Sequence, residues 1–419
     1  MFRFGPDHTG RNPGDTILTV GNVGSLRQRW TGPTGSAPTT RGAVLSSPAV
    51  VGNRVYVGSE NGKLLVYDAA GVQGCSGTPR RCQPVWTAST AGPVESSPAV
   101  VGGRVYVGSG DKALYAFDAA GVQGCSGTPR VCTPIWKFTT SGAIASSPVV
   151  VGGVVYVATR GGFLVAVSTA GKFLWRATLT IASQSSPAVA NGFVYVGSNN
   201  GDLYVFDAAG VKGCSGTPKT CAPRWTAETG DILSGAPTVA NGRVYIGVAN
   251  YLWTYDAQGV LGCGGTPRKC YPLWSGATLG GVVASPAIAG SNVLVASQDG
   301  NLWAFDANGT VGCAGIPVQC EPRWRGFVAS PINSSPAVAN GVVVFGSGDG
   351  YLWAFSAGGT TGCGGTPRVC NPLLRQKAND WTKSVCPGGN GFIYSSPAIS
   401  NGRVFVGSGD CELHAFALP

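Results

Sequence analysis

The short motif Ser46-Ser47-Pro48-Ala49-Val50 recurs along the whole chain and constrains its fold more than any other feature. Successive copies are 39 to 61 residues apart, and most steps are 49 or 50 residues. Such a period is typical of chains built from one small unit that packs against its own copies. The sequence therefore predicts eight repeats, marked by Pro48, Pro98, Pro148, Pro187, Pro237, Pro286, Pro336 and Pro397.

Each repeat has the pattern of a small antiparallel sheet. In the second unit, three apolar or alternating runs cover residues 96–100, 105–108 and 114–118. Asn-Gly pairs separate the first two runs in several other units, and they favour two-residue hairpin turns that need positive φ. A tryptophan then marks a fourth strand in six units, while the seventh has Leu374 there. These tryptophans are Trp86, Trp136, Trp175, Trp225, Trp274 and Trp324.

Eight four-stranded antiparallel sheets can bury both faces by packing around an axis, which predicts an all-β, eight-bladed β-propeller. Trp30 precedes the first motif, whereas the last unit stops at Pro419 after three strands. We therefore expect the N-terminal strand around Trp30 to complete the last blade and close the ring. This predicts one domain over residues 1–419, with a lead-in and closing strand in 1–45 and eight repeats in 46–419. A solenoid is the alternative, but neither end of the chain resembles a polar capping repeat.

Twelve of the fourteen cysteines form six copies of the pattern Cys-x6-Cys. Regular local pairs of this kind predict disulfides and an oxidising compartment. A structural zinc site needs four ligands, and the chain has only His8 and His414 to add, so we expect no metal. The predicted bridges are Cys75–Cys82, Cys125–Cys132, Cys214–Cys221, Cys263–Cys270, Cys313–Cys320 and Cys363–Cys370.

The remaining cysteines predict a seventh bridge, Cys386–Cys411, across the long insertion before the eighth motif. In a propeller, that insertion and the turn that carries Cys411 emerge on the same face. The sequence has no apolar signal-peptide core and no apolar run long enough to span a membrane. We expect an extracellular or periplasmic protein in its mature form, and a monomer.

The repeated pattern Ser-Ser-Pro-Ala-Val, Val-Tyr-Val-Gly-Ser, Leu-Tyr-Ala-Phe-Asp-Ala and Trp resembles the pyrroloquinoline-quinone (PQQ)-type propeller repeat. The opening stretch from Phe4 to Pro13 is similar to the lead-in of many such proteins. The resemblance covers nearly the whole chain. It implies the propeller fold, but the family includes quinoprotein alcohol dehydrogenases, poly(vinyl alcohol) dehydrogenases and the lipoprotein scaffold of the β-barrel assembly machinery, so it does not decide the activity.

Candidate ligand-binding residues follow from the position three residues before each motif proline, which should face the central channel. Its polar occupants are Glu95, Gln184 and Asn333, with Asp231 nearby, and Tyr394 stands there in the eighth unit. The family resemblance implies that Ca²⁺ and PQQ would need a Glu and an Asn as ligands, an Asp as base, a tryptophan floor and often adjacent cysteines. The chain has no Cys-Cys pair, and Glu95, Asn333 and Asp231 belong to blades 2, 7 and 5.

Two further features suggest partners. The insertion from Arg375 to Tyr394 carries Asp380 and Trp381 and could form a lid with a binding role. The Cys-x6-Cys loops repeat basic residues, which would form an interrupted ring of charge on one face and could hold an anionic polymer. Solvated charge is the simpler interpretation, and nucleic acid is disfavoured because no aromatic residues interleave with these charges. The basic loop residues are Arg80, Arg81, Arg130, Lys219, Arg268, Lys269 and Arg368.

Other enzyme classes find little support in the sequence. Two histidines at opposite ends of the chain argue against a catalytic triad, so we predict no catalytic residues. Trp253, Trp303 and Trp353 on third strands could stack on sugars, but their positions match Tyr115 and Tyr204 in other units, which favours blade packing. We expect a non-catalytic scaffold that binds a protein, an anionic polymer or a glycan surface, without a cofactor. The alternatives are a PQQ-dependent dehydrogenase with Ca²⁺ that acts on an alcohol or a polymer alcohol, and a glycan-binding propeller.

Overall fold

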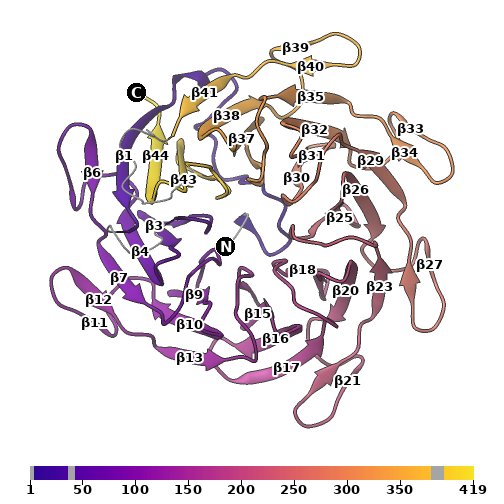
Figure 1. The fold of residues 1–419 in the computed structure, drawn as a ribbon, viewed down its shortest axis with the longest axis horizontal. Helices are drawn as coiled ribbons and strands as arrows, with labels where there is room; N and C mark the ends of the chain where they lie inside the picture. The colour runs from indigo at the N-terminus through magenta and orange to yellow at the C-terminus, as the bar shows by residue number, and fades with distance from the viewer. Residues whose placement is uncertain (1–3, 36–42, 379–390) are drawn as a thin grey trace.

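Eight sheets stand around a central axis and form a closed ring, as predicted (Figure 1). The computed structural model describes residues 4–35, 43–378 and 391–419. Blade 1 comprises β2 (Ala49–Val51), β3 (Arg54–Gly58), β4 (Lys63–Asp68) and β7 (Trp86–Ser89), and blade 2 comprises β8 (Ala99–Val101), β9 (Arg104–Gly108), β10 (Ala113–Asp118) and β13 (Trp136–Thr139). Blade 3 comprises β14 (Val149–Val151), β15 (Val154–Thr159), β16 (Phe163–Ser168) and β17 (Phe173–Thr178), and blade 4 comprises β18 (Ala188–Ala190), β19 (Phe193–Gly197), β20 (Asp202–Asp207) and β23 (Trp225–Glu228).

The last four blades follow the same order from the axis outward. Blade 5 comprises β24 (Thr238–Ala240), β25 (Arg243–Val248), β26 (Tyr251–Asp256) and β29 (Trp274–Ala277), and blade 6 comprises β30 (Ala287–Ala289), β31 (Asn292–Ala296), β32 (Asn301–Asp306) and β35 (Trp324–Phe327). Blade 7 comprises β36 (Ala337–Ala339), β37 (Val342–Gly346), β38 (Tyr351–Ser356) and β41 (Leu374–Lys377), and blade 8 comprises β42 (Ala398–Ser400), β43 (Arg403–Gly407), β44 (Glu412–Ala417) and β1 (Arg27–Pro33).

The ring closes as the sequence predicts. Strand β1 pairs antiparallel with β44, with Trp30 opposite Ala415, so the N-terminal strand is the outer strand of blade 8. A short 3-10 helix, η2 (Val23–Ser25), precedes it. Within the described residues, eight apolar clusters fill the eight interfaces between neighbouring blades. The hydrophobic core is therefore a ring of interfaces, and no blade has a core of its own.

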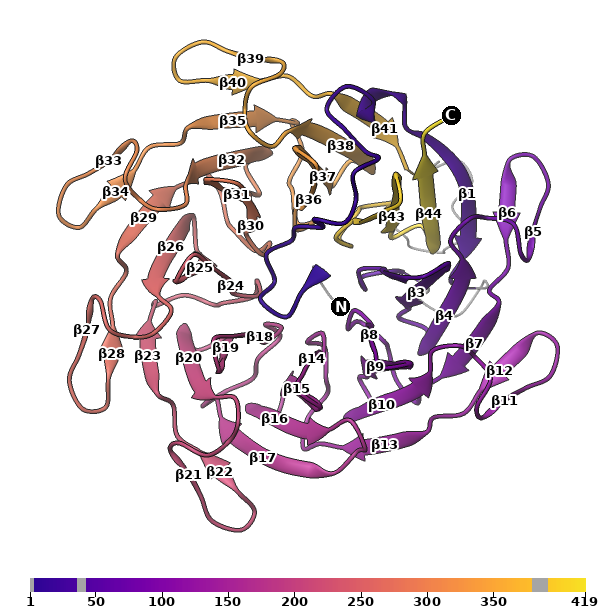
Figure 2. The ribbon, with the colours of Figure 1, turned by 180° about the vertical axis from the view of Figure 1, so that it is seen from behind.

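The six Cys-x6-Cys pairs are disulfide-bonded, and each closes a short hairpin between the third and fourth strands of a blade. The prediction of four-stranded blades is incomplete, because these hairpins add to the neighbouring sheet and give six of the eight sheets six strands. They project outward at the rim (Figure 1 and Figure 2). The hairpin strands are β5 (Cys75–Ser76) and β6 (Arg80–Cys82), β11 (Cys125–Ser126) and β12 (Arg130–Cys132), β21 (Cys214–Ser215) and β22 (Thr220–Cys221), β27 (Cys263–Gly264) and β28 (Lys269–Cys270), β33 (Cys313–Ala314) and β34 (Gln319–Cys320), β39 (Cys363–Gly364) and β40 (Val369–Cys370).

Each hairpin extends the sheet of the preceding blade, not its own. The second hairpin strand pairs parallel to that blade's fourth strand, as β12 does with β7, where Arg130 lies opposite Trp86. The first hairpin pairs in the same way with β1 and so covers the closing strand. Blades 2 and 7 keep four strands, because no hairpin follows the third strand of blade 3 or of blade 8.

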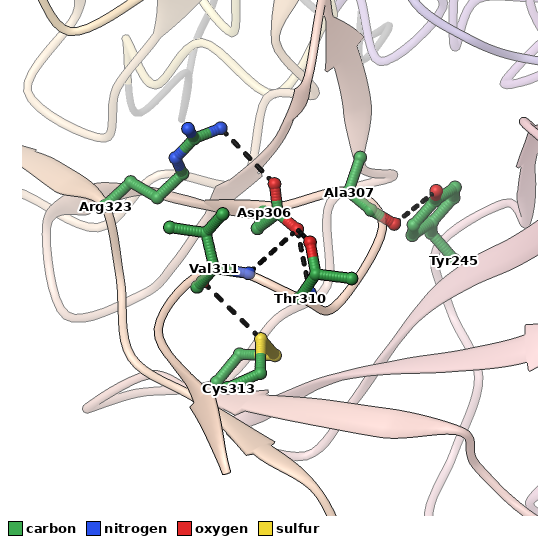
Figure 3. The surroundings of a disulfide bond; sticks show 8 residues. Tyr245, Asp306, Ala307, Thr310, Val311, Cys313 and Arg323 are labelled. Atoms are coloured by element: carbon green, nitrogen blue, oxygen red, sulfur yellow. Dashed lines mark hydrogen bonds and ion pairs between the residues drawn. A yellow bond between two sulfur atoms is a disulfide. The ribbon is translucent and has the colours of Figure 1, made fainter.

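In several blades, two side chains hold the following connection onto the blade. The fourth-strand tryptophan packs on a glycine of the next connection, as Trp225 does on Gly259, where an added Cβ would lie 2.3 Å from the indole ring. In several blades a second-strand tyrosine hydroxyl donates to a backbone carbonyl at the start of the same connection, as Tyr245 does to Ala307 at 2.8 Å (Figure 3). The connection is thus held by packing, by a buried hydrogen bond and by strand pairing.

The aspartate at the end of the third strand fixes the start of the connection. Asp306 accepts hydrogen bonds from the backbone of Thr310 and Val311 and lies 3.4 Å from Arg323 (Figure 3). Burial alone would raise the pKa of Asp306, but the hydrogen bonds from Thr310 and Val311, together with Arg323, lower its pKa below the usual value. The repeated Asp-Ala of the sequence is therefore a capping element of the turn.

The Ser-Ser-Pro motif lines the axis and links the blades. The backbone N–H of the second serine donates to the hydroxyl of the second serine in the next blade, as Ser47 does to Ser97 at 2.9 Å. Ser396 donates to Ser47 and closes the circle. Blade 5 has Gly235 and Ala236 in place of the serines, so the hydroxyl that blade 4 would bond to is missing there. The other links of the described ring are made by Ser97, Ser147, Ala236, Ser285 and Ser335.

The N-terminal lead-in runs along the inner rim of blades 4 to 8. Backbone carbonyls of Pro6 and Asp7 accept from the first strands of blades 4 and 5, at 2.6 and 2.8 Å. Asn12 donates to Ile399 in blade 8, and Asp15 accepts from Gly402. The innermost strands are sheet edges with unpaired backbone groups, and the lead-in satisfies one or two of these groups in each of blades 4 to 8.

We predict that Gly259→Ala destabilises the propeller by about 2 to 5 kcal/mol, because it combines positive φ with a clash against Trp225. The matched control is Gly242→Ala, which has a similar φ of +71° and no atom within 4 Å of the added Cβ. It should lose only about 1 to 2 kcal/mol. Urea unfolding followed by tryptophan fluorescence measures both. Equal losses of unfolding free energy in the two variants would show that the contact between Trp225 and Gly259 does not contribute to stability.

We also predict alkaline destabilisation caused by the buried inter-blade tyrosines. Burial raises the pKa of Tyr156 and of Tyr245 to about 12. Above pH 10 the unfolded chain ionises these tyrosines while the folded chain keeps them protonated, so the free energy of unfolding should be constant up to about pH 9 and fall between pH 10 and 12. Urea titrations across this range measure it. A flat profile up to pH 12 would contradict the prediction.

Candidate functional site at the axis

Three blades contribute to a polar cluster beside the axis. Arg160, in the turn between β15 and β16, donates to the carboxylate of Glu95 at 2.8 Å and to the side-chain oxygen of Gln184 at 3.3 Å. Glu95 and Gln184 stand just before the motifs of blades 2 and 4, so the arginine of blade 3 bridges its two neighbours. Sequence reasoning found the two acceptors but missed Arg160. Arg160 is the one basic residue at this turn position, and that was the signal that could have found it. The other blades have Glu60, Gly110, Asn199, Ala249, Gln298, Gly348 and Gly409 there.

The other predicted site residues do not join this cluster. Asn333 accepts a hydrogen bond from Gln298 at 3.1 Å, across blades 6 and 7. Asp231 is exposed and accepts from the backbone of Ile232. Tyr394 packs against Phe392, with ring centroids 5.8 Å apart. The structure therefore divides the predicted site into separate polar groups on different blades.

Three predictions concern residues outside those that the structure describes. Asp380 and Trp381, the predicted lid residues, belong to this part of the chain, as does Cys386. Cys411 is itself disulfide-bonded. The predicted pairing of Cys411 with Cys386 and the lid therefore remain predictions.

A cavity of about 410 Å³ lies at the axis beneath the lead-in. Phe4, Gly10 and Asn12 line it on one side, and the motif segments of blades 1, 7 and 8 line it on the other. Its walls are mainly backbone, small side chains and prolines. None of the described residues that line it is charged, so these residues offer no ligand set for a cation or an anionic cofactor.

Blade 8 contains the single cluster of possible metal ligands found among the described residues. Ligand atoms of Asp410, Glu412 and His414 lie within 4.8 Å of one another. Glu412 also forms an ion pair with Arg81 at 3.1 Å. The contact between Asp410 and His414 has the same repeat position as the hydrogen bond from Tyr115 to Asp111 in blade 2, which favours a turn-fixing role over metal binding.

The residues at the axis do not fit Ca²⁺ and PQQ. The carboxylate of Glu95 is already neutralised by Arg160, and Asn333 is bonded to Gln298 on the far side of the ring. The described tryptophans lie on third or fourth strands, away from the innermost strand, so none forms a floor at the axis. A calcium site would need several oxygen ligands that converge on one point.

Two of the three third-strand tryptophans are buried within the blades, whereas Trp253 is half-buried. Trp303 and Trp353 are each 6% exposed, and their indole N–H groups donate to Asp299 and Ser347. Arg325 lies over Trp303, at the edge of an outer groove of about 1270 Å³. Little of either ring face is open to a sugar, so the structure favours blade packing for these tryptophans.

The basic residues of the hairpins have structural roles that the sequence did not reveal. Five of them donate to the carbonyl of the glycine under the preceding tryptophan, as Arg268 does to Gly259 at 2.8 Å. Lys269 and Arg81 instead pair with acidic residues of the preceding blade. The remaining members of the first group are Arg80, Arg130, Lys219 and Arg368.

Fold and site together define an eight-bladed propeller with hairpins clamped by disulfides, in which the described residues at the axis form no converging set of cofactor ligands. The family described as outer membrane protein assembly factor BamB matches residues 79–123 and 131–212. The predicted resemblance to the PQQ-like propeller family is thereby confirmed. None of the curated proteins matches the chain.

Solved structures share the fold at low sequence identity. BamB from Moraxella catarrhalis is 15% identical, with a TM-score of 0.62, over 94% of this chain and 97% of that one. Quinohemoprotein alcohol dehydrogenase from Comamonas testosteroni is 14% identical, with a TM-score of 0.67, over 100% of this chain and 80% of that one. The computationally designed Ika8 protein is 13% identical, with a TM-score of 0.64, over 93% and 99%. A likeness at this identity extends to the fold alone.

We predict that Arg160→Ala changes the free energy of unfolding by less than about 1 kcal/mol, because exposed ion pairs contribute little to stability. The side chains of Arg160 and Glu95 are 41% and 27% exposed. Urea unfolding beside the wild type measures the change. A loss above about 2 kcal/mol would show that the cluster serves the fold, and it would leave Arg160 unsuitable as a probe of binding.

Proposed function

We propose that this protein is a non-catalytic, extracytoplasmic scaffold that binds another protein at the face around Glu95, Arg160 and Gln184. The observation that carries the proposal is the bridge that Arg160 makes between blades 2 and 4. It holds a charged, partly exposed group in one orientation on a rigid ring, and exposed polar groups of this kind suit specific recognition. The likeness to BamB, whose name describes an assembly factor, points in the same direction.

The compartment is part of the proposal. Disulfides persist in oxidising environments, and the described residues contain six complete cystine pairs, so the protein functions outside the cytoplasm, in a periplasm or extracellular space. No helix among the described residues is long and apolar enough to cross a membrane.

Site-specific photo-crosslinking tests the scaffold. A photoreactive residue at Gln184 should give one reproducible protein adduct in extracytoplasmic extracts, while the same residue at the rim position Gln319 should not. Glu95→Gln combined with Arg160→Gln should reduce the adduct at least about tenfold, because both charges of the recognition group are lost. Equal adducts from both positions, or an adduct that survives the double substitution, would overturn the proposed binding face.

Reconstitution with PQQ and Ca²⁺ separates this function from the alcohol dehydrogenase alternative. We expect no stoichiometric retention of the quinone absorbance and no dye reduction with alcohols or poly(vinyl alcohol), because Glu95 and Asn333 are engaged in separate interactions. Retention with turnover would overturn the non-catalytic scaffold. Saturable binding on a carbohydrate array would instead support the glycan-binding alternative.

A further inference from the structure

The topology places all connections between third and fourth strands on one face of the ring, together with the turns between first and second strands. We call this the hairpin face; its connections are residues 69–85, 119–135, 169–172, 208–224, 257–273, 307–323 and 357–373. They contain eleven lysines and arginines and one acidic residue, Glu321. The basic residues are Arg80, Arg81, Arg130, Lys172, Lys212, Lys219, Arg224, Arg268, Lys269, Arg323 and Arg368.

The opposite face has the reverse balance. Its described turns between second and third strands, and its described connections from fourth to first strands, contain two basic residues, Lys112 and Arg160. Seven acidic residues share these segments: Glu60, Glu95, Asp111, Asp231, Asp299, Asp349 and Asp410. The net charge of +10 is therefore strongly polarised between the two faces of the described ring.

Most charges of the hairpin face are available to a partner. Three of the eleven basic residues form ion pairs, namely Arg81, Lys269 and Arg323. The other eight form no ion pair with the described residues, and those that bond to a glycine carbonyl keep their full positive charge. Lys172, Lys212 and Arg224 are exposed. Such a concentration of one sign attracts an extended anionic surface.

The same connections present exposed aliphatic side chains at one repeat position. Val72, Val122, Val211 and Val260 are 63% to 70% exposed. Each follows the glycine under a tryptophan, and its backbone N–H is held by the aspartate that ends the third strand. A single exposed valine is ordinary. Four of them on fixed turns among basic residues form a rim that is both cationic and apolar.

We propose that the hairpin face docks on an anionic phospholipid membrane surface. Basic residues near a negatively charged leaflet each gain roughly a fivefold preference for the membrane. Aliphatic side chains among them add affinity by entering the boundary between headgroups and acyl chains. An anionic polysaccharide would satisfy the charges but leave the valines in water, so the combination favours lipid. The acidic face with Glu95 and Arg160 would then point away from the membrane, toward a protein partner.

Co-sedimentation of the full chain with vesicles tests this. We expect binding to vesicles of phosphatidylglycerol and phosphatidylcholine, weaker binding at high salt, and none to phosphatidylcholine alone. Lys212→Gln with Arg224→Gln should lower the vesicle partition coefficient by roughly 25-fold, at about fivefold per charge. Lys63→Gln with Lys377→Gln removes the same charge from the ends of β4 and β41 at the opposite face, and it should change binding less than about twofold.

A third variant separates lipid from a soluble polyanion. Val211→Ser with Val260→Ser should weaken vesicle binding at least about threefold and leave binding of dextran sulfate unchanged. Both side chains are exposed, so the fold should tolerate the change, and unfolding curves verify it. No binding to anionic vesicles, equal effects of the two charge variants, or insensitivity to the valine change would each overturn membrane docking. In the last case an anionic polymer would replace the membrane as partner.

Discussion

The propeller depends on the docking of each connection onto the preceding blade. A glycine lies under the neighbour's tryptophan, and in several blades a tyrosine hydroxyl bonds to the start of the same connection. Because the apolar clusters all lie between blades, no sheet buries its faces without a neighbour. The ring closure through Trp30 is therefore as important as any internal contact, and the first hairpin covers it.

The disulfides stabilise the same docking of each connection onto the preceding blade. Each bond closes only a short local loop, worth roughly 2 to 3 kcal/mol by loop entropy. Its larger role is to keep a two-stranded hairpin rigid, so that the hairpin can pair with a strand of another blade. The basic residues repeated in these loops serve the same purpose, because they fix the hairpin to the glycine carbonyl.

Both proposed binding functions are consistent with a rigid disc that has two different faces. The blades supply a scaffold that is fixed at the axis by the serine ring and the lead-in. Its acidic face carries the Arg160 cluster and its hairpin face carries the basic residues and valines. The two proposals use opposite faces, so the protein could bind a partner and a surface at the same time.

The fold was predictable because its determinants are local and repeated: the motif, the turn pairs and the Cys-x6-Cys loops recur in almost every unit. The single strand at the N-terminal end and the three strands at the C-terminal end likewise predicted the ring closure. The site was far less predictable. Glu95, Gln184 and Asn333 were found as polar exceptions at an axial position. That Arg160 binds the first two and that Asn333 bonds elsewhere depends on contacts between different blades, which no local pattern encodes.

The sequence by itself determined the number of blades, their order and the local disulfide pairs, since each follows from residues close together in the chain. Only the tertiary structure decided that hairpins add to the preceding blade, that the lead-in bonds to the inner edges of blades 4 to 8 and that charge separates onto two faces. These features depend on contacts between residues of different repeats, and their geometry exists only once the ring has closed.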